Sequence, residues 1–382
     1  MMKVCMVCDV LGEENNGTTV AAMNLIRSLR AKGHKVTVVC PDQNRRGLEG
    51  YVIVDKLNLG PLNSYVEKNG VTLSRASKKL LEPVIAEADV VHLLIPFSLA
   101  NAALHIAKKY NKPVTASFHA QAENITSHLF MKDFELANKI AYLQMYYATY
   151  RHVDAVHYPT EFIRDVFENA VGHKTNAYVI SNGVGERFKP NGAQKPAEYR
   201  NKFVILFSGR YSKEKSHSVL IDAVALSKHE SRIQLIFAGD GPLKDRLREY
   251  AKKLTNRPVF SFFPHRQMLN VLNYADLYVH PAEIEIEAIA CLEAIACGQV
   301  PIISDSKKSA TKKFALDERN LFKANDPQDL AEKIDFFIEN PAVLAEYKER
   351  YKGMAEEYSQ TNCMNRMEQM LFDAIEKKRH HG

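Results

Sequence analysis

The stretch LYVHPAEIEIEAIACLEAIACGQVPIISD, residues 277–305, holds two short apolar runs separated by a longer helical pattern. The runs from Leu277 to His280 and from Val300 to Ile303 have the length of buried β-strands. Between them lie a loop rich in glutamate and a helical segment that ends at Gly298, a residue type common at helix ends. A strand, a helix and a second strand in this order predict a βαβ unit with parallel strands.

The same alternation extends along most of the chain. Short apolar runs recur before residue 120 and after residue 202, and longer segments of helical character follow them. Repeated βα units predict an α/β protein with two doubly wound domains, each built around a parallel sheet. The other expected strands are Val4 to Cys8, Val36 to Cys40, Val90 to Leu94, Val114 to Phe118, Phe203 to Phe207 and Ile233 to Ala238; the expected helices include Thr18 to Lys32, Leu99 to Lys109, Ser216 to Lys228 and Pro242 to Leu254.

Two domains require a boundary, and residues 186–202 have the composition of one. This segment, ERFKPNGAQKPAEYRNK, carries prolines, a glycine and charges in place of periodic apolar residues. We therefore expect an N-terminal domain over 1–185, a linker over 186–202 and a C-terminal domain over 203–360. Over 361–382 we expect a helix that packs back across the domains, because apolar residues recur there at helical spacing. These residues are Met364, Met367, Met370 and Leu371.

The composition favours a globular enzyme of the cytoplasm. With 382 residues, 46% of them hydrophobic, the chain can bury sizeable cores. The net charge of +6 suits phosphate-bearing ligands or an anionic membrane surface without requiring either. Cys5 and Cys8 form a C-x-x-C, but they lie in a strand-like run and lack a second close pair for zinc. The start MMKVCMVCDV lacks signal-peptide features, and no long uninterrupted apolar segment follows.

The segment FVILFSGRYSKEKSHSVLIDAV places two cations at the carboxyl end of a strand. Arg210 and Lys215 lie five residues apart, after Gly209 and before a helix, where they can hold a diphosphate whose charge grows as it leaves. A solvated basic loop is the alternative. Further on, Gly239 begins a tight GDGP turn, which is mainly architectural but lies at the same sheet edge and can line a nucleotide site.

Two carboxylates, Glu285 and Glu293, lie eight residues apart in the opening stretch. Carboxylates near a helix start can accept hydrogen bonds from ribose or hexose hydroxyls. An acidic surface helix is the alternative, but Ala, Ile, Cys and Leu surround Glu293, and a partly buried carboxylate needs partners. A weaker signal is the loop after Asp9, which contains Gly12 and Gly17 before a helix but lacks a full G-x-G-x-x-G.

In this order, the motifs resemble those of glycosyltransferase family 4, whose members are retaining enzymes of the GT-B fold. The resemblance covers nearly the whole chain and rests on VISNGVGERFKP, SGRYSKEK, FAGDGPL and an E-x7-E that continues into EAIACGQVPIISD. It implies two Rossmann-like doubly wound domains facing a central cleft, with a C-terminal helical segment. It also implies that the N-terminal domain binds the acceptor and the C-terminal domain binds the nucleotide sugar.

The resemblance further implies roles for individual residues. Arg210 and Lys215 would bind the donor diphosphate, and Glu293 would bind the ribose hydroxyls. Glu285 would contact the transferred sugar, and His119, in TASFHAQAEN, matches the histidine beside the reacting sugar, so these two are the candidate catalytic residues. Gly17 would let its loop approach the donor phosphate. The candidate donor-binding residues are Gly17, Arg210, Lys215, Gly239, Glu285, Leu292 and Glu293.

The chain departs from the family after the first glutamate of E-x7-E. Members usually have Gly-Phe-Gly there, whereas this chain has Ile286, Glu287 and Ala288. The segments EIEIEAIACLEAIACG, FHAQAENITSHLF and VDAVHYPTEFIRD resemble membrane-associated synthases that transfer glucose or galactose to diacylglycerol or a related lipid. The alternatives are a soluble family member that acts on a sugar, polysaccharide precursor or small metabolite, and a non-enzymatic nucleotide-sugar-binding protein, which the presence of both motifs disfavours. The donor hexose, the acceptor, the linkage and the oligomeric state stay open.

The resemblance implies a UDP-sugar as co-substrate and an α-linked product. The sequence contains no D-x-D triplet, so we expect transfer without a metal or other cofactor, with cations and helix amides neutralising the leaving diphosphate. No nucleic-acid partner is expected. Residues 124–158 mix apolar, aromatic and basic side chains, so Lys132, Lys139 and Arg151 can meet lipid phosphates at the inner face of the cell membrane. A helix packed against its own domain is the alternative.

Overall fold

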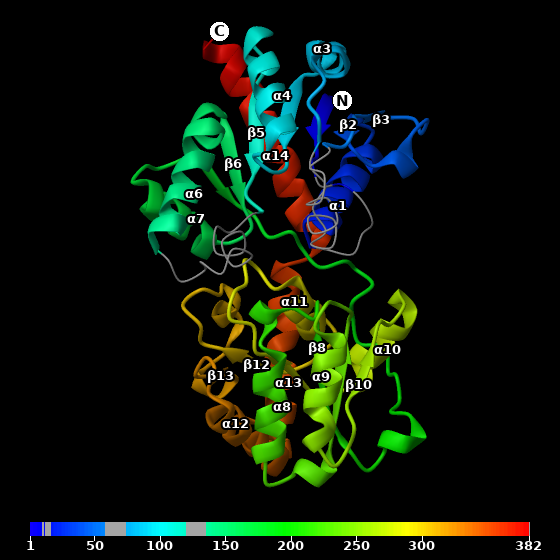
Figure 1. Ribbon diagram of the computed structural model, residues 1–382. Coiled ribbons are helices and arrows are strands. Elements are labelled where there is room, and N and C mark those ends of the chain that lie inside the picture. Colours follow the sequence, from blue (N-terminus) through cyan, green and yellow to red (C-terminus); the bar gives the residue numbers. More distant parts are fainter. Residues whose placement is uncertain (10, 12–16, 58–73, 120–134, 382) are drawn as a thin grey trace. The chain divides into compact units, whose positions relative to one another are not determined.

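The structure is a computed structural model that describes every residue except 10, 12–16, 58–73, 120–134 and 382. Contacts within the chain divide it into two units (Figure 1). The N-terminal unit contains residues 1–182 and 361–382, and the C-terminal unit contains residues 183–360. Residues 186–202, the expected linker, group with the C-terminal unit.

A parallel sheet forms the centre of the N-terminal unit. In the described residues it has seven strands in the order β3-β2-β1-β4-β5-β6-β7, each parallel to its neighbours. The order reverses between β1 and β4, so the chain winds outward from β1 in both directions, as in doubly wound folds. The strands are β1 (Lys3–Val7), β2 (Lys35–Cys40), β3 (Tyr51–Ile53), β4 (Val90–Leu93), β5 (Val114–Ser117), β6 (Ala155–Tyr158) and β7 (Ala177–Val179).

Helices follow these strands, and local sequence sets their ends. The helix α7 (Glu161–Val171) begins after Thr160, whose side-chain oxygen accepts the N–H of Ile163. It ends at Gly172, which has a φ of +74° that glycine adopts without strain. The other described helices between β1 and β7 are α1 (Gly17–Ala31), α3 (Lys78–Glu87), α4 (Ser98–Lys109) and α6 (Glu135–Ala148).

The last helix, α14 (Gln360–His381), packs into the N-terminal unit although the C-terminal unit precedes it in the sequence. Its apolar face joins the core that contains β1 and β2. Glu368 forms an ion pair with Lys32 and a hydrogen bond with His34 Nε2 at 2.6 Å. The apolar spacing that predicted this helix therefore also selects the face that it buries. The buried residues of that face include Cys363, Met364, Met367, Met370 and Leu371.

The C-terminal unit, which is described throughout, repeats the doubly wound plan. Its six parallel strands have the order β10-β9-β8-β11-β12-β13, with the reversal between β8 and β11. The predicted α/β class with two doubly wound sheets is confirmed. The strands are β8 (Phe203–Ser208), β9 (Ile233–Ala238), β10 (Val259–Ser261), β11 (Leu277–His280), β12 (Pro301–Ser304) and β13 (Leu321–Phe322); the helices are α8 (His217–Leu226), α9 (Lys244–Tyr250), α10 (His265–Tyr274), α11 (Ile289–Ala296), α12 (Pro327–Glu339) and α13 (Pro341–Glu357).

Truncation of the buried face of α14 should destabilise the N-terminal unit. Met370 is fully buried, so Met370→Ala is expected to lower the free energy of unfolding by about 2–5 kcal/mol through lost burial and an unfilled cavity. The neighbouring exposed residue provides the control, because Gln369→Ala removes no buried group. Scanning calorimetry compares the two variants, and equal unfolding temperatures would contradict this packing of α14.

Candidate functional site

The loops that follow β8 and β11 meet at the point where the strand order of the C-terminal sheet reverses. In open parallel sheets the carboxyl edge at such a reversal is the usual place for ligands. Lys215 lies in the loop after β8 and Glu285 in the loop after β11. The Lys215 ammonium donates a hydrogen bond to Glu285 Oε2, and the two side chains are 19% and 16% exposed. The structure thus brings two of the predicted site residues into direct contact.

The ion pair keeps both of its members charged. Burial raises the pKa of Glu285, but Lys215 and His280 outweigh it and lower that pKa to about 2. Burial lowers the pKa of Lys215, but Glu285 and Glu214 outweigh it and raise that pKa above its usual value. Glu285 is therefore a hydrogen-bond acceptor at neutral pH and has no proton to give.

A histidine that the sequence patterns did not single out lies beside this pair. His280 is the last residue of β11, is 1% exposed, and has its Nε2 3.4 Å from Glu285 Oε2. The pKa of His280 is lowered, because burial and the charge of Lys215 outweigh the opposing effect of Glu285. His217, buried at the start of α8, has a pKa lowered to about 3 by burial and by the positive charge of Lys215. A histidine at the carboxyl end of a strand, five residues before Glu285, was the signal available in the sequence.

Backbone hydrogen bonds hold the loop that carries Glu285. The N–H of Ala310 donates to the Glu285 carbonyl oxygen at 2.9 Å, and the Glu285 N–H donates to the Lys308 carbonyl oxygen at 3.3 Å. The N–H of Glu283 donates to the carbonyl oxygen of Glu214 at 2.8 Å, which ties this loop to the segment that carries Lys215. The loop that carries Glu285 is therefore held from two sides.

The departure from the family's Gly-Phe-Gly has a structural cost at Ala288. This residue precedes α11 and has φ +61° and ψ +57°, the left-handed region that glycine adopts freely. A side chain there costs about 1–2 kcal/mol. Ala288 therefore holds a backbone conformation that a glycine would adopt without strain.

Glu293 lies in α11 and is half-buried. Burial raises its pKa to about 7, and the positive charge of Arg187 opposes that rise. Glu285 and Glu293 both lie near the buried ring of Tyr278, because each adds to the rise in the pKa of that phenol, which burial dominates. The sequence predicted apolar surroundings for Glu293, and their effect is to make its carboxyl group easier to protonate.

Close backbone packing explains the glycines beside Arg210. A Cβ added to Gly239 would lie 2.0 Å from the carbonyl oxygen of Gly209, and one added to Gly241 would lie 2.6 Å from the backbone nitrogen of Tyr211. The loops after β8 and β9 therefore touch through their main chains. Arg210 lies half-buried in the first of these loops.

The remaining predicted residues lie as follows. Leu292 is 1% exposed in α11, and its N–H donates to the Ala288 carbonyl oxygen at 3.2 Å. Its contact with the nucleotide sugar stays a prediction.

Gly17 is the exposed first residue of α1, and an added Cβ there would meet nothing within 4 Å. His119 follows β5, is half-buried, and has a pKa lowered by burial and by His157 and His92. Lys132 lies outside the described residues.

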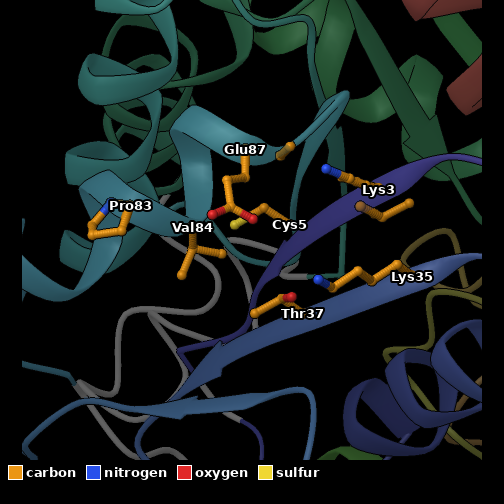
Figure 2. A pocket seen from close by; sticks show the side chains of 9 residues that line it. Lys3, Cys5, Lys35, Thr37, Pro83, Val84 and Glu87 are labelled. Carbon is orange, nitrogen blue, oxygen red and sulfur yellow. The ribbon is translucent and has the colours of Figure 1, made fainter.

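A separate hollow occurs at the opposite edge of the N-terminal sheet, at the amino ends of β1 and β2 beside α3 (Figure 2). It measures about 140 Å³, and its lining includes Lys3, Cys5, Lys35, Thr37 and Glu87. Sites for small organic ligands usually measure about 300–1,000 Å³. The hollow contains none of the predicted site residues. Among the described residues, no group of three or more His, Cys, Asp or Glu side chains is arranged to hold a metal ion.

Comparisons with known proteins match both halves of the chain to described families. Residues 15–187 match the family described as Glycosyltransferase Family 4, and residues 188–357 match Glycosyl transferases group 1. An alpha-monoglucosyldiacylglycerol synthase of Acholeplasma laidlawii is 24% identical over 95% of this chain and 94% of its own length. A phosphatidyl-myo-inositol mannosyltransferase of Mycobacterium tuberculosis is 27% identical over 80% of this chain and 78% of its own. Anabaena Alr3699/HepE, solved with UDP and glucose, is 16% identical, has a TM-score of 0.73, and covers 98% of this chain and 100% of its own, which shows the GT-B fold.

The raised pKa of Glu293 should make stability depend on pH. A carboxyl group whose pKa is about 7 when folded and 4.5 when unfolded favours the fold fully below pH 4.5, and this contribution is lost as the pH rises to 7. The variant Glu293→Gln should therefore gain stability relative to the wild type between pH 4.5 and 7. Calorimetry across this range measures the difference, with Glu249→Gln at an exposed position as control. Parallel curves for Glu293→Gln and the wild type would contradict the assigned pKa.

Proposed function

Since the chain belongs to glycosyltransferase family 4, we propose that it transfers a hexose from UDP-glucose or UDP-galactose to a lipid acceptor such as 1,2-diacylglycerol, with retention of configuration. The Lys215–Glu285 pair at the strand-order reversal is the observation that carries this proposal. It offers a cation for the donor diphosphate beside a carboxylate for the sugar hydroxyls, both at the edge where such sheets bind nucleotides.

The charges of the pair suit the departure of a diphosphate. In the transfer step, the bond between the anomeric carbon and the phosphate oxygen breaks, and the acceptor oxygen bonds to the same face of that carbon. The hydroxyl proton of the acceptor passes to the departing phosphate oxygen. Lys215 stays protonated and stabilises the charge that grows on that phosphate. Glu285 stays ionised, so it can accept hydrogen bonds from the sugar and stabilise positive charge at the ring.

The assignment of the other residues follows the same scheme. Arg210, in the loop that carries Lys215, would share the diphosphate, and Glu293 would accept hydrogen bonds from the ribose. His119 of the N-terminal unit would stand beside the reacting sugar, and Gly17 would leave room for the donor at the start of α1. No metal is needed in this scheme, because protein cations neutralise the phosphate.

The lipid acceptor is supported first by the relatives. The synthase of Acholeplasma laidlawii and the mannosyltransferase of Mycobacterium tuberculosis are both named for lipid products or acceptors. These two proteins differ in the sugar that they are named for. The two relatives therefore support a lipid acceptor but do not identify the donor hexose.

An exposed apolar stripe on α6 supports contact with a lipid surface. Leu136, Ile140 and Tyr147 are 57%, 56% and 49% exposed, and their spacing puts them on one side of the helix. Lys139 is exposed on the same helix, and the guanidinium of Arg151 lies 5.0 Å from the ring centre of Tyr147. Apolar side chains flanked by cations fit an anionic bilayer, where the chains enter the interface and the cations meet phosphates. None of the helices in the described part of the chain is long and apolar enough to cross a membrane.

Product analysis tests the proposal directly. The protein is incubated, with EDTA present, with UDP-glucose or UDP-galactose and liposomes that contain diacylglycerol or ceramide, beside a panel of water-soluble acceptors. Mass spectrometry should find a hexosyl lipid. Transfer to soluble acceptors without a lipid product would leave a glycosyltransferase but overturn the lipid acceptor.

Two variants link that product to the ion pair. Lys215→Gln should lower kcat by about 10²–10³-fold, because one group that stabilises the leaving charge is lost. The exposed Lys213, two residues away, gives the matched control Lys213→Gln, which should keep the wild-type rate. Far-UV circular dichroism checks that both variants fold. Wild-type turnover by Lys215→Gln would contradict the donor site.

The α6 stripe should be needed for binding to vesicles. Leu136→Ser with Ile140→Ser should weaken binding about tenfold or more, since a fully buried side chain of this size contributes about 1.5–3 kcal/mol. Co-sedimentation with vesicles of phosphatidylglycerol and phosphatidylcholine measures the change. Leu226→Ser is the control, because this leucine is 51% exposed in the C-terminal unit. Equal sedimentation of the double variant and the wild type would contradict membrane contact through α6.

A further inference from the structure

A chain of buried hydrogen bonds crosses three neighbouring strands of the N-terminal sheet beneath His119. His92 of β4 bonds through Nδ1 to Thr115 Oγ1 at 2.8 Å and through Nε2 to Ser117 Oγ at 3.0 Å. Ser117 Oγ is also 2.9 Å from His157 Nδ1, and His157 Nε2 is 2.7 Å from the carbonyl oxygen of Ile180. The four side chains that bond to one another are at most 2% exposed.

The acceptor at one end sets the direction of every bond in this chain. The carbonyl oxygen of Ile180 can only accept, so His157 Nε2 carries a hydrogen. Burial lowers the pKa of His157 to about 4, so the ring is neutral and its Nδ1 accepts the Ser117 hydroxyl hydrogen. Ser117 Oγ then accepts from His92 Nε2, and the neutral His92 accepts from Thr115 through Nδ1. Both imidazoles are thereby held in one tautomer and one orientation.

Strand geometry connects this chain to His119. Thr115 and Ser117 are two residues apart on β5, so their side chains point to the same face of the sheet. The strand pairing continues past them, because the Phe118 N–H donates to the His157 carbonyl oxygen at 2.8 Å. His119 is the next residue in that alternation. Its ring meets the ring of His157 edge-on, with the ring centres 5.7 Å apart and an angle of 71° between the planes.

We propose that Ser117, His92 and His157 are positioning residues for His119, because their hydrogen bonds fix the His157 ring against which the His119 ring packs. The inference rests on the proposed role of His119 beside the reacting sugar. An apolar core needs no such chain, because each buried polar group loses its hydration and must then find a bonding partner. Its place at the carboxyl edge, directly under a candidate catalytic side chain, fits a support for the geometry of the site.

The buried surroundings also keep the His119 ring neutral, because burial lowers its pKa well below the usual value. His92 and His157 are the histidines that, after burial itself, lower the pKa of His119. A neutral His119 with a fixed ring can hold one hydrogen-bond donor and one acceptor toward the sugar. The loss of the Ser117 hydroxyl would leave His157 Nδ1 without its donor and free the ring to turn.

Kinetics of transfer provide the first test. Ser117→Ala and His157→Gln should lower kcat about 10- to 100-fold while KM for the UDP-sugar changes less than about twofold, because orientation is lost and donor binding is not. The matched control is His34→Gln. His34 is a buried histidine of the same unit, and its Nδ1 accepts from the Met2 N–H at 3.1 Å while its Nε2 meets Glu368. The control should lose stability but keep kcat, and an equal loss of kcat in His34→Gln would overturn the inference.

Nuclear magnetic resonance of the histidine rings gives a readout that does not depend on activity. In protein labelled with ¹⁵N-histidine, the tautomer signals of His119 should change in Ser117→Ala and His157→Gln but not in His34→Gln. Unchanged His119 signals in the first two variants would overturn the inference. If the wild type forms no hexosyl product while these signals do change, the proposed function fails and the positioning of His119 stands.

Discussion

Parallel pairing of β8 with β11 is the constraint on which the candidate site depends. Parallel strands bring all their carboxyl ends to one edge, and the strand order reverses at this pair, where such sheets usually bind ligands. Lys215 and Glu285, which are 70 residues apart in the sequence, meet there. The glycine contact between the loops after β8 and β9 adds a third strand end to the same edge.

The exposure of the Lys215–Glu285 pair is intermediate between that of a surface ion pair and that of a fully buried one. Both side chains are largely removed from water, so each depends on the other to stay charged, and an isolated member would carry a large desolvation penalty. The neighbouring histidines contribute no second cation, because burial lowers the pKa values of both His217 and His280. An anionic group that binds here meets a lysine already held in place, which limits the entropy lost on binding.

The N-terminal unit places its polar groups differently. His92 and His157 lie in an uncharged hydrogen-bond chain on the sheet, whereas the ion pair between Glu368 and Lys32 joins α14 to the amino-end edge. The helix α14 completes the apolar core of this unit from the far end of the chain. The carboxyl edge, where His119 lies, is therefore supported by hydrogen bonds and the opposite edge by packing and ion pairs.

The sequence by itself determined the alternation of strands and helices and the two doubly wound sheets. It also determined the positions of Arg210, Lys215 and Glu285 after strand ends and of Glu293 in the following helix. These are local properties, because the periods of apolar residues and the glycine turns act over a few neighbouring residues. The tertiary structure decided that Lys215 pairs with Glu285, that His280 lies beneath them, and that α14 packs into the N-terminal unit. It also decided the left-handed backbone of Ala288 and the raised pKa of Glu293. Such features depend on contacts between distant segments and on removal from water, which exist once the sheets have formed.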